Sequence, residues 1–311
     1  MASRPVGSAS ARSPRKIPEF PVGPAGRLVP AVGLGTSAFP FQFVEEEVKA
    51  AVLAALELGY RHLDTASLYL SERAVGEAVA EAARRGLVAS REEVFVTTKL
   101  WCTQCHPELV LPSLRESLQN LQMEYVDLYL VHWPMAIKPS KPQFPIKRED
   151  IMPMDLSGVW QAMEESHRLG LAKMIGVSNF TTRKLKELLA TANIPPAVNQ
   201  VRFSSLIRQI EKYSICSSSL HLFQHLLNIL KYVFVVISLR WIYEQGASMV
   251  VKSWKQERIK ENTEIFDWEL SDEDRLKIRQ MPQHKMATVT GILSPEGVSS
   301  VDISEVDVIE T

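Results

Sequence analysis

The feature that most constrains the fold is a regular alternation of short apolar runs with longer amphipathic segments. Runs typical of buried strands lie at 29–36, 60–66, 93–101, 125–134, 172–180, 197–203 and 248–254. Segments with the apolar spacing of helices lie at 45–59, 72–86, 109–122, 157–170 and 183–193. Strands that alternate with helices in this way indicate βαβ units around a parallel sheet. We therefore predict an α/β fold, specifically a (β/α)8 TIM barrel.

Composition argues against several classes of protein. The chain has 311 residues and a formal net charge of −1, so no overall field attracts nucleic acid or an anionic membrane. No apolar run reaches the ~18–20 residues of a membrane-spanning helix. Cys102, Cys105 and Cys216 are too few for a disulfide framework and fit a reducing compartment. We therefore expect a cytoplasmic protein that binds neither nucleic acid nor a membrane. We also expect a monomer, since no obligate protein partner is evident.

Polar residues stand where the predicted strands end. Asp64, Lys99 and His132 each close an apolar run, and Tyr69 follows Asp64 in the next loop. In a barrel the carboxyl ends of the strands form the catalytic face, so these side chains should converge. An ammonium lowers the pKa of a nearby phenol, a carboxylate holds the ammonium, and an imidazole orients a substrate oxygen. This set suits protonation of a carbonyl oxygen while hydride reaches the carbon, although a plain Asp–Lys ion pair is the alternative.

Several longer stretches resemble the aldo-keto reductases. The resemblance is to the plant group that contains codeinone reductase, methylecgonone reductase, chalcone reductase and deoxymugineic acid synthase. It extends from about residue 29 to 285 with one interruption, and its stretches are "VGLGT", "GYRHLDTASLY", "VFVTTKLW", "YVDLYLVHWP", "GLAKMIGVSNF", "PPAVNQV", "SLRWIYEQG" and "VVKSWKQERIKEN". The resemblance implies NADPH-dependent reduction of a small-molecule carbonyl substrate. It also implies that Tyr69 is the general acid, Lys99 tunes its pKa, Asp64 partners Lys99 and His132 orients the substrate.

The same resemblance implies a cofactor site without a Rossmann fold. Ser178, Asn179 and Gln200 match positions that hydrogen-bond the nicotinamide carboxamide, and Gly35 and Thr36 belong to "VGLGT". The adenosine-phosphate segment corresponds to Lys252, Ser253, Arg258, Glu261 and Asn262. Lys252 and Arg258 are cationic donors suited to a 2′-phosphate, although a charged surface helix is the alternative.

Aromatic and sulfur-containing residues near these positions have two interpretations each. Trp101 and Trp133, beside the predicted catalytic positions, are candidates to line the substrate mouth with His132, and core packing is the alternative. "CTQCH" at 102–106 has the spacing of a haem attachment site, but no further ligand for a metal stands out, and we expect no metal.

One segment departs from the family pattern. Between "AVNQV" and "SLRWIYEQG" the chain is shorter than its relatives, and residues 203–237 lack the expected seventh-strand motif. "YVFVVI" at 232–237 is composed like a strand, but too little chain follows it for a normal crossover. A smaller departure is Ser71, where many reductases have Asn before the Glu. We therefore predict a barrel that is incomplete or distorted at its seventh β/α unit.

These observations divide the chain and leave two hypotheses for its function. We expect a disordered tail at 1–24, a barrel at 25–285 with 203–237 atypical, and a C-terminal substrate-loop tail at 286–311. The first hypothesis is an active NADPH-dependent aldehyde or ketone reductase. The second is a non-catalytic or non-functional reductase homologue that at most binds a ligand, because its seventh-strand region is replaced.

Overall fold

A curled parallel sheet forms the centre of the molecule. The computed structural model describes residues 16–23, 25–37, 44–201 and 235–280. The sheet has seven strands in the order β10-β9-β6-β5-β4-β3-β11, and all neighbours are parallel. The strands are β3 (Val32–Gly35), β4 (His62–Asp64), β5 (Phe95–Leu100), β6 (Val126–Val131), β9 (Ala172–Ser178), β10 (Asn199–Gln200) and β11 (Met249–Val251). Strands β3, β4, β5, β6, β9 and β10 follow one another in the sheet, and β11 returns to the side of β3. Among the described residues the ring is therefore open between β10 and β11.

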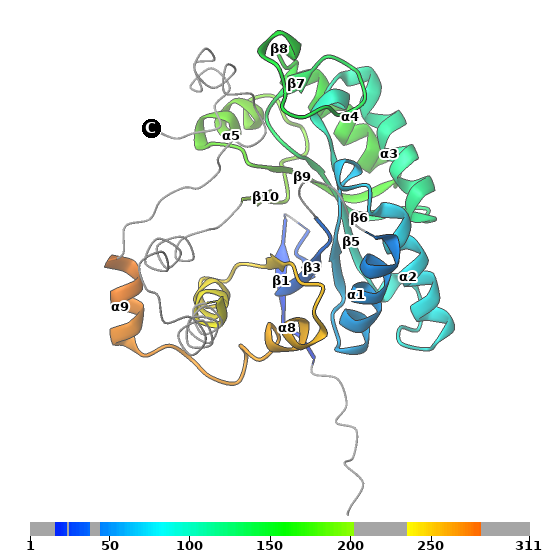
Figure 1. The fold of residues 1–311 in the computed structure, drawn as a ribbon. Helices are drawn as coiled ribbons and strands as arrows, with labels where there is room; N and C mark the ends of the chain where they lie inside the picture. The colour runs from blue at the N-terminus through cyan, green and yellow to red at the C-terminus, as the bar shows by residue number, and fades with distance from the viewer. Residues whose placement is uncertain (1–15, 24, 38–43, 202–234, 281–311) are drawn as a thin grey trace, which may run out of the picture.

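Helices cover the outer face of this sheet, as Figure 1 shows for α1 to α4. The helices of the described residues are α1 (Glu45–Glu57), α2 (Glu72–Arg84), α3 (Pro107–Leu121), α4 (Leu156–Arg168), α5 (Thr182–Leu189), a helix at 235–244, α8 (Gln256–Glu261) and α9 (Asp272–Gln280). Helix α9 has no buried residue and lies apart from the sheet in Figure 1. Local sequence sets several ends. Asp155 and Thr181 cap α4 and α5 by accepting hydrogen bonds from backbone N–H groups. Gly59, which follows α1, has a φ of 95°, a value that favours glycine.

Shorter elements fill the loops at both ends of the strands. Strands β7 (Ala136–Ile137) and β8 (Ile151–Met152) pair antiparallel in the segment after β6. The 3-10 turns are η1 (Ser67–Tyr69), η2 (Arg91–Glu93), η3 (Cys102–Gln104) and η4 (Arg148–Asp150). Of these, η1 and η3 directly follow β4 and β5, so they belong to the carboxyl-end face of the sheet.

The apolar core has an outer and an inner part. Every residue of β5 and β6 is buried, as expected for strands covered on both faces. The outer part lies between sheet and helices and includes the fully buried Trp160 of α4. The inner part lies inside the curl of the sheet and consists of Val29, Phe95, Leu128, Leu130 and Met174. The inner cluster fills the lower part of the curl and leaves the polar strand ends above it.

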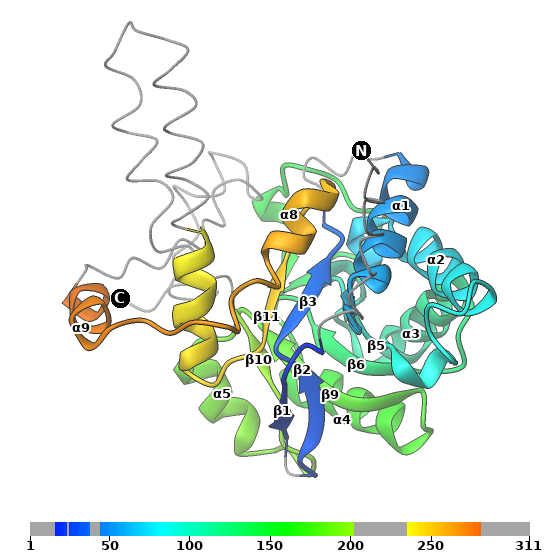
Figure 2. The ribbon, with the colours of Figure 1, turned by 90° about the horizontal axis from the view of Figure 1, so that it is seen from below.

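An N-terminal hairpin packs against this inner cluster and corrects one predicted boundary. Strands β1 (Glu19–Val22) and β2 (Arg27–Pro30) pair antiparallel, and Figure 2 shows them across the lower end of the sheet. Val29 joins the inner core, so the hairpin is held by apolar burial. The expected disordered tail at 1–24 is therefore too long, because Glu19–Val22 forms an ordered strand; residues 1–15 lie outside the described part.

The seventh β/α unit of the barrel has no strand among the described residues. Residues 202–234 lie outside the described part, which covers most of the atypical segment 203–237. Residues 235–237, the end of "YVFVVI", belong to the helix at 235–244 and not to a strand. The physical reason is spacing, since the residues packed on the core are Val235, Val236, Leu239, Ile242 and Tyr243, which is a helical stripe. The prediction of a (β/α)8 barrel incomplete at this unit is confirmed.

Candidate active site

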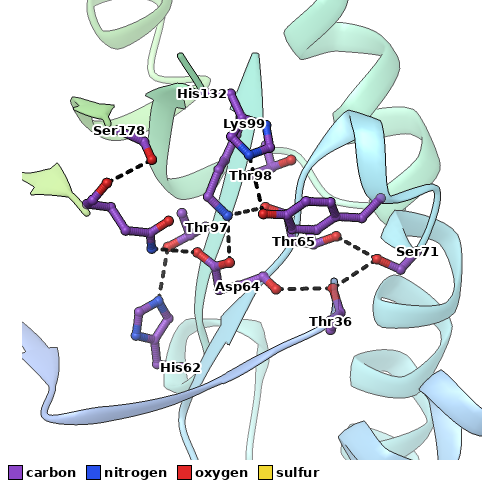
Figure 3. Close-up of polar contacts among 12 residues, drawn as sticks. Thr36, His62, Asp64, Thr65, Ser71, Thr97, Thr98, Lys99, His132 and Ser178 are labelled. Atoms are coloured by element: carbon purple, nitrogen blue, oxygen red, sulfur yellow. Dashed lines mark hydrogen bonds and ion pairs between the residues drawn. The ribbon is translucent and has the colours of Figure 1, made fainter. Parts of the chain in front are cut away.

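Three neighbouring strands bring the predicted catalytic groups to one place. Asp64 ends β4, Lys99 lies near the end of β5, and His132 directly follows β6. These strands are adjacent in the sheet, and all three side chains are buried at its carboxyl-end face (Figure 3). The parallel register pairs Asp64 with Thr97 and Lys99 with Leu130, so residues far apart in sequence meet at one end of the sheet.

Lys99 is the centre of a buried hydrogen-bond cluster. Its Nζ atom donates to Asp64 Oδ1 at 2.5 Å and to the carbonyl oxygen of Thr65 at 3.0 Å. Burial lowers the pKa of Lys99, but the Asp64 carboxylate and the Tyr69 hydroxyl outweigh burial and leave that pKa raised. Lys99 is therefore an ammonium at physiological pH, and Asp64 fixes its position.

Tyr69 ends the turn η1 and directs its hydroxyl at this cluster. The hydroxyl lies 3.3 Å from His132 Nε2 and also hydrogen-bonds the Lys99 side chain. Burial raises the pKa of Tyr69, and this effect exceeds the lowering caused by Lys99. The expectation that Lys99 lowers the pKa is right for that single interaction, but the net pKa is raised. The phenol therefore keeps its proton at neutral pH and can donate it.

His132 is a neutral imidazole in this setting. Burial, together with the nearby Lys99 ammonium, holds its pKa well below the ordinary value. Nδ1 is buried and has no hydrogen-bond partner among the described residues. A buried N–H without an acceptor is rarer than a buried acceptor without a donor, so the proton is better placed on Nε2. That tautomer directs an N–H to the side of the ring that faces Tyr69.

The two tryptophans surround this group with apolar surface. Trp101 is buried, and its ring meets His132 edge-on with ring centres 5.3 Å apart. Trp101 also packs with Leu68, Cys102, Met135, Ile137 and Ile146, while Trp133 is partly buried against the same cluster. Both tryptophans thus lie beside the polar group, and Trp101 also has the core-packing role considered as its alternative.

The residues expected at the nicotinamide lie on the next two strands. Ser178 Oγ donates to the carbonyl oxygen of Gln200 at 2.8 Å, and Asn179 Nδ2 donates to the carbonyl oxygen of His132 at 2.9 Å. Gln200 Nε2 donates to Asp64 Oδ2 at 2.9 Å. The structure therefore brings this set together with Asp64 and His132.

Gly35 and Thr36 lie on the other side of Asp64. Gly35 pairs with Asp64 in the sheet, and an added Cβ at Gly35 would meet a side-chain atom of Val250 at 2.9 Å. Thr36 is completely buried, and its hydroxyl donates to the carbonyl oxygen of Asp64 at 3.1 Å. The Thr36 side chain therefore holds the backbone of Asp64 in place through this hydrogen bond.

The predicted adenosine-phosphate residues form a separate group on β11 and α8. No contact in the described part of the chain joins the side chains of Lys252, Ser253, Arg258, Glu261 or Asn262 to the Asp64–Lys99 pair. Lys252 and Arg258 are exposed, and neither is paired with a carboxylate among the described residues. Their charges are thus available for an anionic group, which is the donor chemistry that a phosphate requires.

Sequence reasoning missed several hydroxyl residues of the site. Ser67 Oγ donates to the carbonyl oxygen of Lys99 at 3.0 Å, and Thr65 supplies one acceptor for the ammonium. Ser71 is buried next to Thr36 and Thr65. Their position within the run that carries Asp64 and Tyr69 was the available signal, but hydroxyl residues after a strand equally indicate an ordinary turn.

The remaining sulfur and membrane expectations concern other parts of the molecule. Cys102 and Cys105 are buried free thiols, and Cys216 lies outside the described residues. Over the described ranges, no three or more His, Cys, Asp or Glu side chains form a cluster that could hold a metal ion. None of the helices within those ranges is both long and apolar enough to span a bilayer.

Comparison with known proteins supplies the family. The model of the aldo/keto reductase family matches residues 31–219. An NADPH-dependent codeinone reductase of Papaver somniferum is 44% identical over 297 residues, which cover 88% of this chain and 92% of the relative. A deoxymugineic acid synthase of Triticum aestivum is also 44% identical, over 83% of this chain and 89% of its own.

A solved structure agrees with these relatives. The crystal structure of an aldo-keto reductase of Bombyx mori in complex with NADP superimposes with a TM-score of 0.70 at 32% identity, covering 86% of this chain and 93% of that one. The family model spans more than half of the chain, and its relatives are matched over most of their length. This chain belongs to the aldo/keto reductase family.

Proposed function

We propose that this protein reduces an aldehyde or ketone to an alcohol, with NADPH as the reductant. The observation that carries the proposal is the 3.3 Å approach of the Tyr69 hydroxyl to His132 Nε2 beside the Lys99 ammonium. Two such donors, so close together, can both bind one carbonyl oxygen, which is how enzymes stabilise charge that develops on oxygen. The printed descriptions of the codeinone reductases as NADPH-dependent support the same cofactor here.

In this mechanism the four groups have separate roles. The carbonyl oxygen accepts hydrogen bonds from Tyr69 and from His132 Nε2–H, and this contact holds the carbonyl in place. NADPH, when bound, supplies a hydride to the carbonyl carbon. Tyr69 then transfers its proton to the oxygen, and the Lys99 ammonium stabilises the phenolate that remains. Asp64 keeps the ammonium at the phenol through the 2.5 Å contact.

The cofactor would be held by residues on both sides of the open edge. Ser178, Asn179 and Gln200 offer hydroxyl and amide groups for the nicotinamide carboxamide. Exposed Lys252 and Arg258 suit the 2′-phosphate that distinguishes NADPH from NADH, because Arg binds phosphate with paired hydrogen bonds. Ser253, Glu261 and Asn262 lie on the same short segment and would contact the adenosine part. Gly35 and Thr36, which lie next to Asp64, would complete the cofactor site from the end of β3.

A second candidate is a reductase relative that binds the nucleotide or a partner without turnover. The observation that favours it is the open ring, since no strand of the described residues lies between β10 and β11. The predicted nicotinamide and phosphate residues lie on opposite sides of that opening. Both candidates can bind the nucleotide, but only the first catalyses the reaction. Turnover is therefore the property that distinguishes them.

The experiment that separates the candidates measures binding and turnover on the same preparation. Fluorescence titration with NADPH and NADH measures binding, and absorbance with 4-nitrobenzaldehyde measures consumption of the reductant. We expect saturable binding that prefers NADPH and aldehyde-dependent oxidation of it. Binding without oxidation would select the non-catalytic candidate. The absence of both would contradict the proposed reductase and would leave only a homologue that has lost nucleotide binding as well. Gel filtration of the same sample tests our expectation that the protein is a monomer. Fractionation of source tissue tests the expected cytoplasmic location.

A further inference from the structure

A chain of three buried hydroxyl groups lies directly behind the Lys99 site. Thr36, Thr65 and Ser71 are fully buried and come from the segments after β3, after β4 and before α2. Ser71 Oγ lies 2.8 Å from Thr36 Oγ1 and 3.0 Å from Thr65 Oγ1, so Ser71 is the central member (Figure 3). No part of this group is available to solvent, and its contacts are made within the protein.

Counting protons gives the direction of these hydrogen bonds. Each hydroxyl donates one proton. Thr36 donates its proton to the carbonyl oxygen of Asp64, so it must accept from Ser71. Ser71 has then used its proton, so it must accept from Thr65. The bonds therefore run from Thr65 through Ser71 and Thr36 to the carbonyl oxygen of Asp64. The series thus begins and ends on two consecutive residues, Thr65 and Asp64.

Ser71 makes these bonds at the expense of a more usual role. It occupies the N-cap position of α2, where a serine side chain normally accepts from a backbone N–H of the first turn. Its side chain makes no such capping bond. The hydroxyl is instead held between two strand ends, which indicates that its position serves the site more than the helix.

The chain of hydroxyls connects Asp64 and Thr65, which both bind the Lys99 ammonium. Each supplies one oxygen atom that accepts from Lys99 Nζ, and the Tyr69 hydroxyl is a third partner of that side chain. Ser71 follows Tyr69 by two residues, and Leu70 between them has a strained φ of 59°. Ser71 thus fixes one end of the Tyr69 turn to the same dipeptide that holds the ammonium.

We infer that Ser71 is a positioning residue, which sets the Tyr69 hydroxyl against Lys99 by tying the turn to the ends of β3 and β4. The inference deepens the proposed function and rests on it for its kinetic consequence. Ser71 does not contact the carbonyl or the cofactor in this scheme, so its loss should slow the chemical step and leave binding unchanged.

The kinetic test compares Ser71→Ala with a matched buried serine. Displacement of a catalytic group by a fraction of an ångström costs rate, so Ser71→Ala should lower kcat by about tenfold with KM unchanged. The deuterium isotope effect with 4-deuterated NADPH should rise, because hydride transfer becomes more rate-limiting. Ser71→Thr, which restores a hydroxyl, should recover most of kcat. Ser166→Ala removes another fully buried hydroxyl, bonded to Ala162 on α4, and should leave kcat and the isotope effect unchanged.

A second measurement does not depend on turnover. Hydrogen–deuterium exchange over 65–71 should be faster in Ser71→Ala and in Thr36→Val, which keeps the side-chain volume, but not in Ser166→Ala. Exchange and kcat equal to those of the unaltered protein in both variants would overturn the inference. If the unaltered protein does not oxidise NADPH in the presence of aldehyde, the proposed function fails, while the exchange data still decide whether Ser71 holds the turn.

Discussion

At the scale of single residues, burial decides the protonation of the site. Lys99 keeps its proton because Asp64 lies 2.5 Å away, although burial alone would favour the neutral amine. Burial raises the pKa of Tyr69 and lowers that of His132, so both side chains remain uncharged. A protonated phenol, a neutral imidazole and an ammonium are the states that the proposed mechanism uses.

These states predict how activity depends on pH. His132 does not gain a proton near its ordinary pKa of 6.5, and Tyr69 does not lose its proton until above its ordinary value of 10.0. The kcat/KM for reduction should therefore be constant from about pH 5.5 to 9 and fall only in more alkaline solution. Steady-state rates across this range measure it. An activity that falls with a midpoint near the ordinary histidine value would contradict the assigned states.

At the scale of elements, a glycine determines how α2 and α3 approach each other behind the site. An added Cβ at Gly76 of α2 would lie 2.1 Å from the carbonyl oxygen of Leu121 at the end of α3. A backbone atom cannot turn aside as a flexible side chain can, so the helices would have to separate. The first turn of α2 also carries the buried Glu72, which accepts a hydrogen bond from Thr98 beside Lys99.

This close approach predicts a large effect of one methyl group. Gly76→Ala should lower the free energy of unfolding by about 2–3 kcal/mol, the cost of overpacking, despite the better helix propensity of alanine. Arg73→Ala, on the exposed side of the same helix, should change it by less than about 0.5 kcal/mol. Urea unfolding followed by circular dichroism measures both. Equal stability of the two variants would show that the helices move apart without cost.

Most elements and the three polar strand ends could be predicted from the sequence, for a physical reason. Buried parallel strands and amphipathic helices leave strong apolar patterns, and a strand end fixes where Asp64, Lys99 and His132 meet. The net pKa of Tyr69 could not be predicted, because it depends on a balance between burial and Lys99. The hairpin of β1 and the helical end of "YVFVVI" were also missed, since short apolar runs take their conformation from tertiary packing.

At the scale of the whole molecule, the proposed catalytic residues and most of the proposed cofactor residues lie on different strands of the sheet. The four proposed catalytic residues lie on β4, β5 and β6 or in the loops after them, in the middle of the sheet. Most residues proposed for the cofactor lie toward both edges of the sheet (Figure 2). They are on or directly after β9 and β10 at one edge, and in the segment that follows β11 and includes α8 at the other. Gly35 and Thr36, at the end of β3, are the exception. Each edge strand is only two or three residues long, which limits pairing with other chains. The arrangement of Asp64, Tyr69, Lys99 and His132 is therefore kept although no strand of the described residues lies between β10 and β11.

The most direct test of the account is the rate of NADPH oxidation by Tyr69→Phe in the presence of saturating aldehyde. This variant removes one hydroxyl and keeps the ring that packs on His132. The account predicts a loss of kcat of about 10²-fold or more, the contribution of a positioned proton donor, with NADPH binding unchanged by fluorescence. A kcat equal to that of the unaltered protein would contradict the central claim that the Tyr69 phenol protonates the substrate.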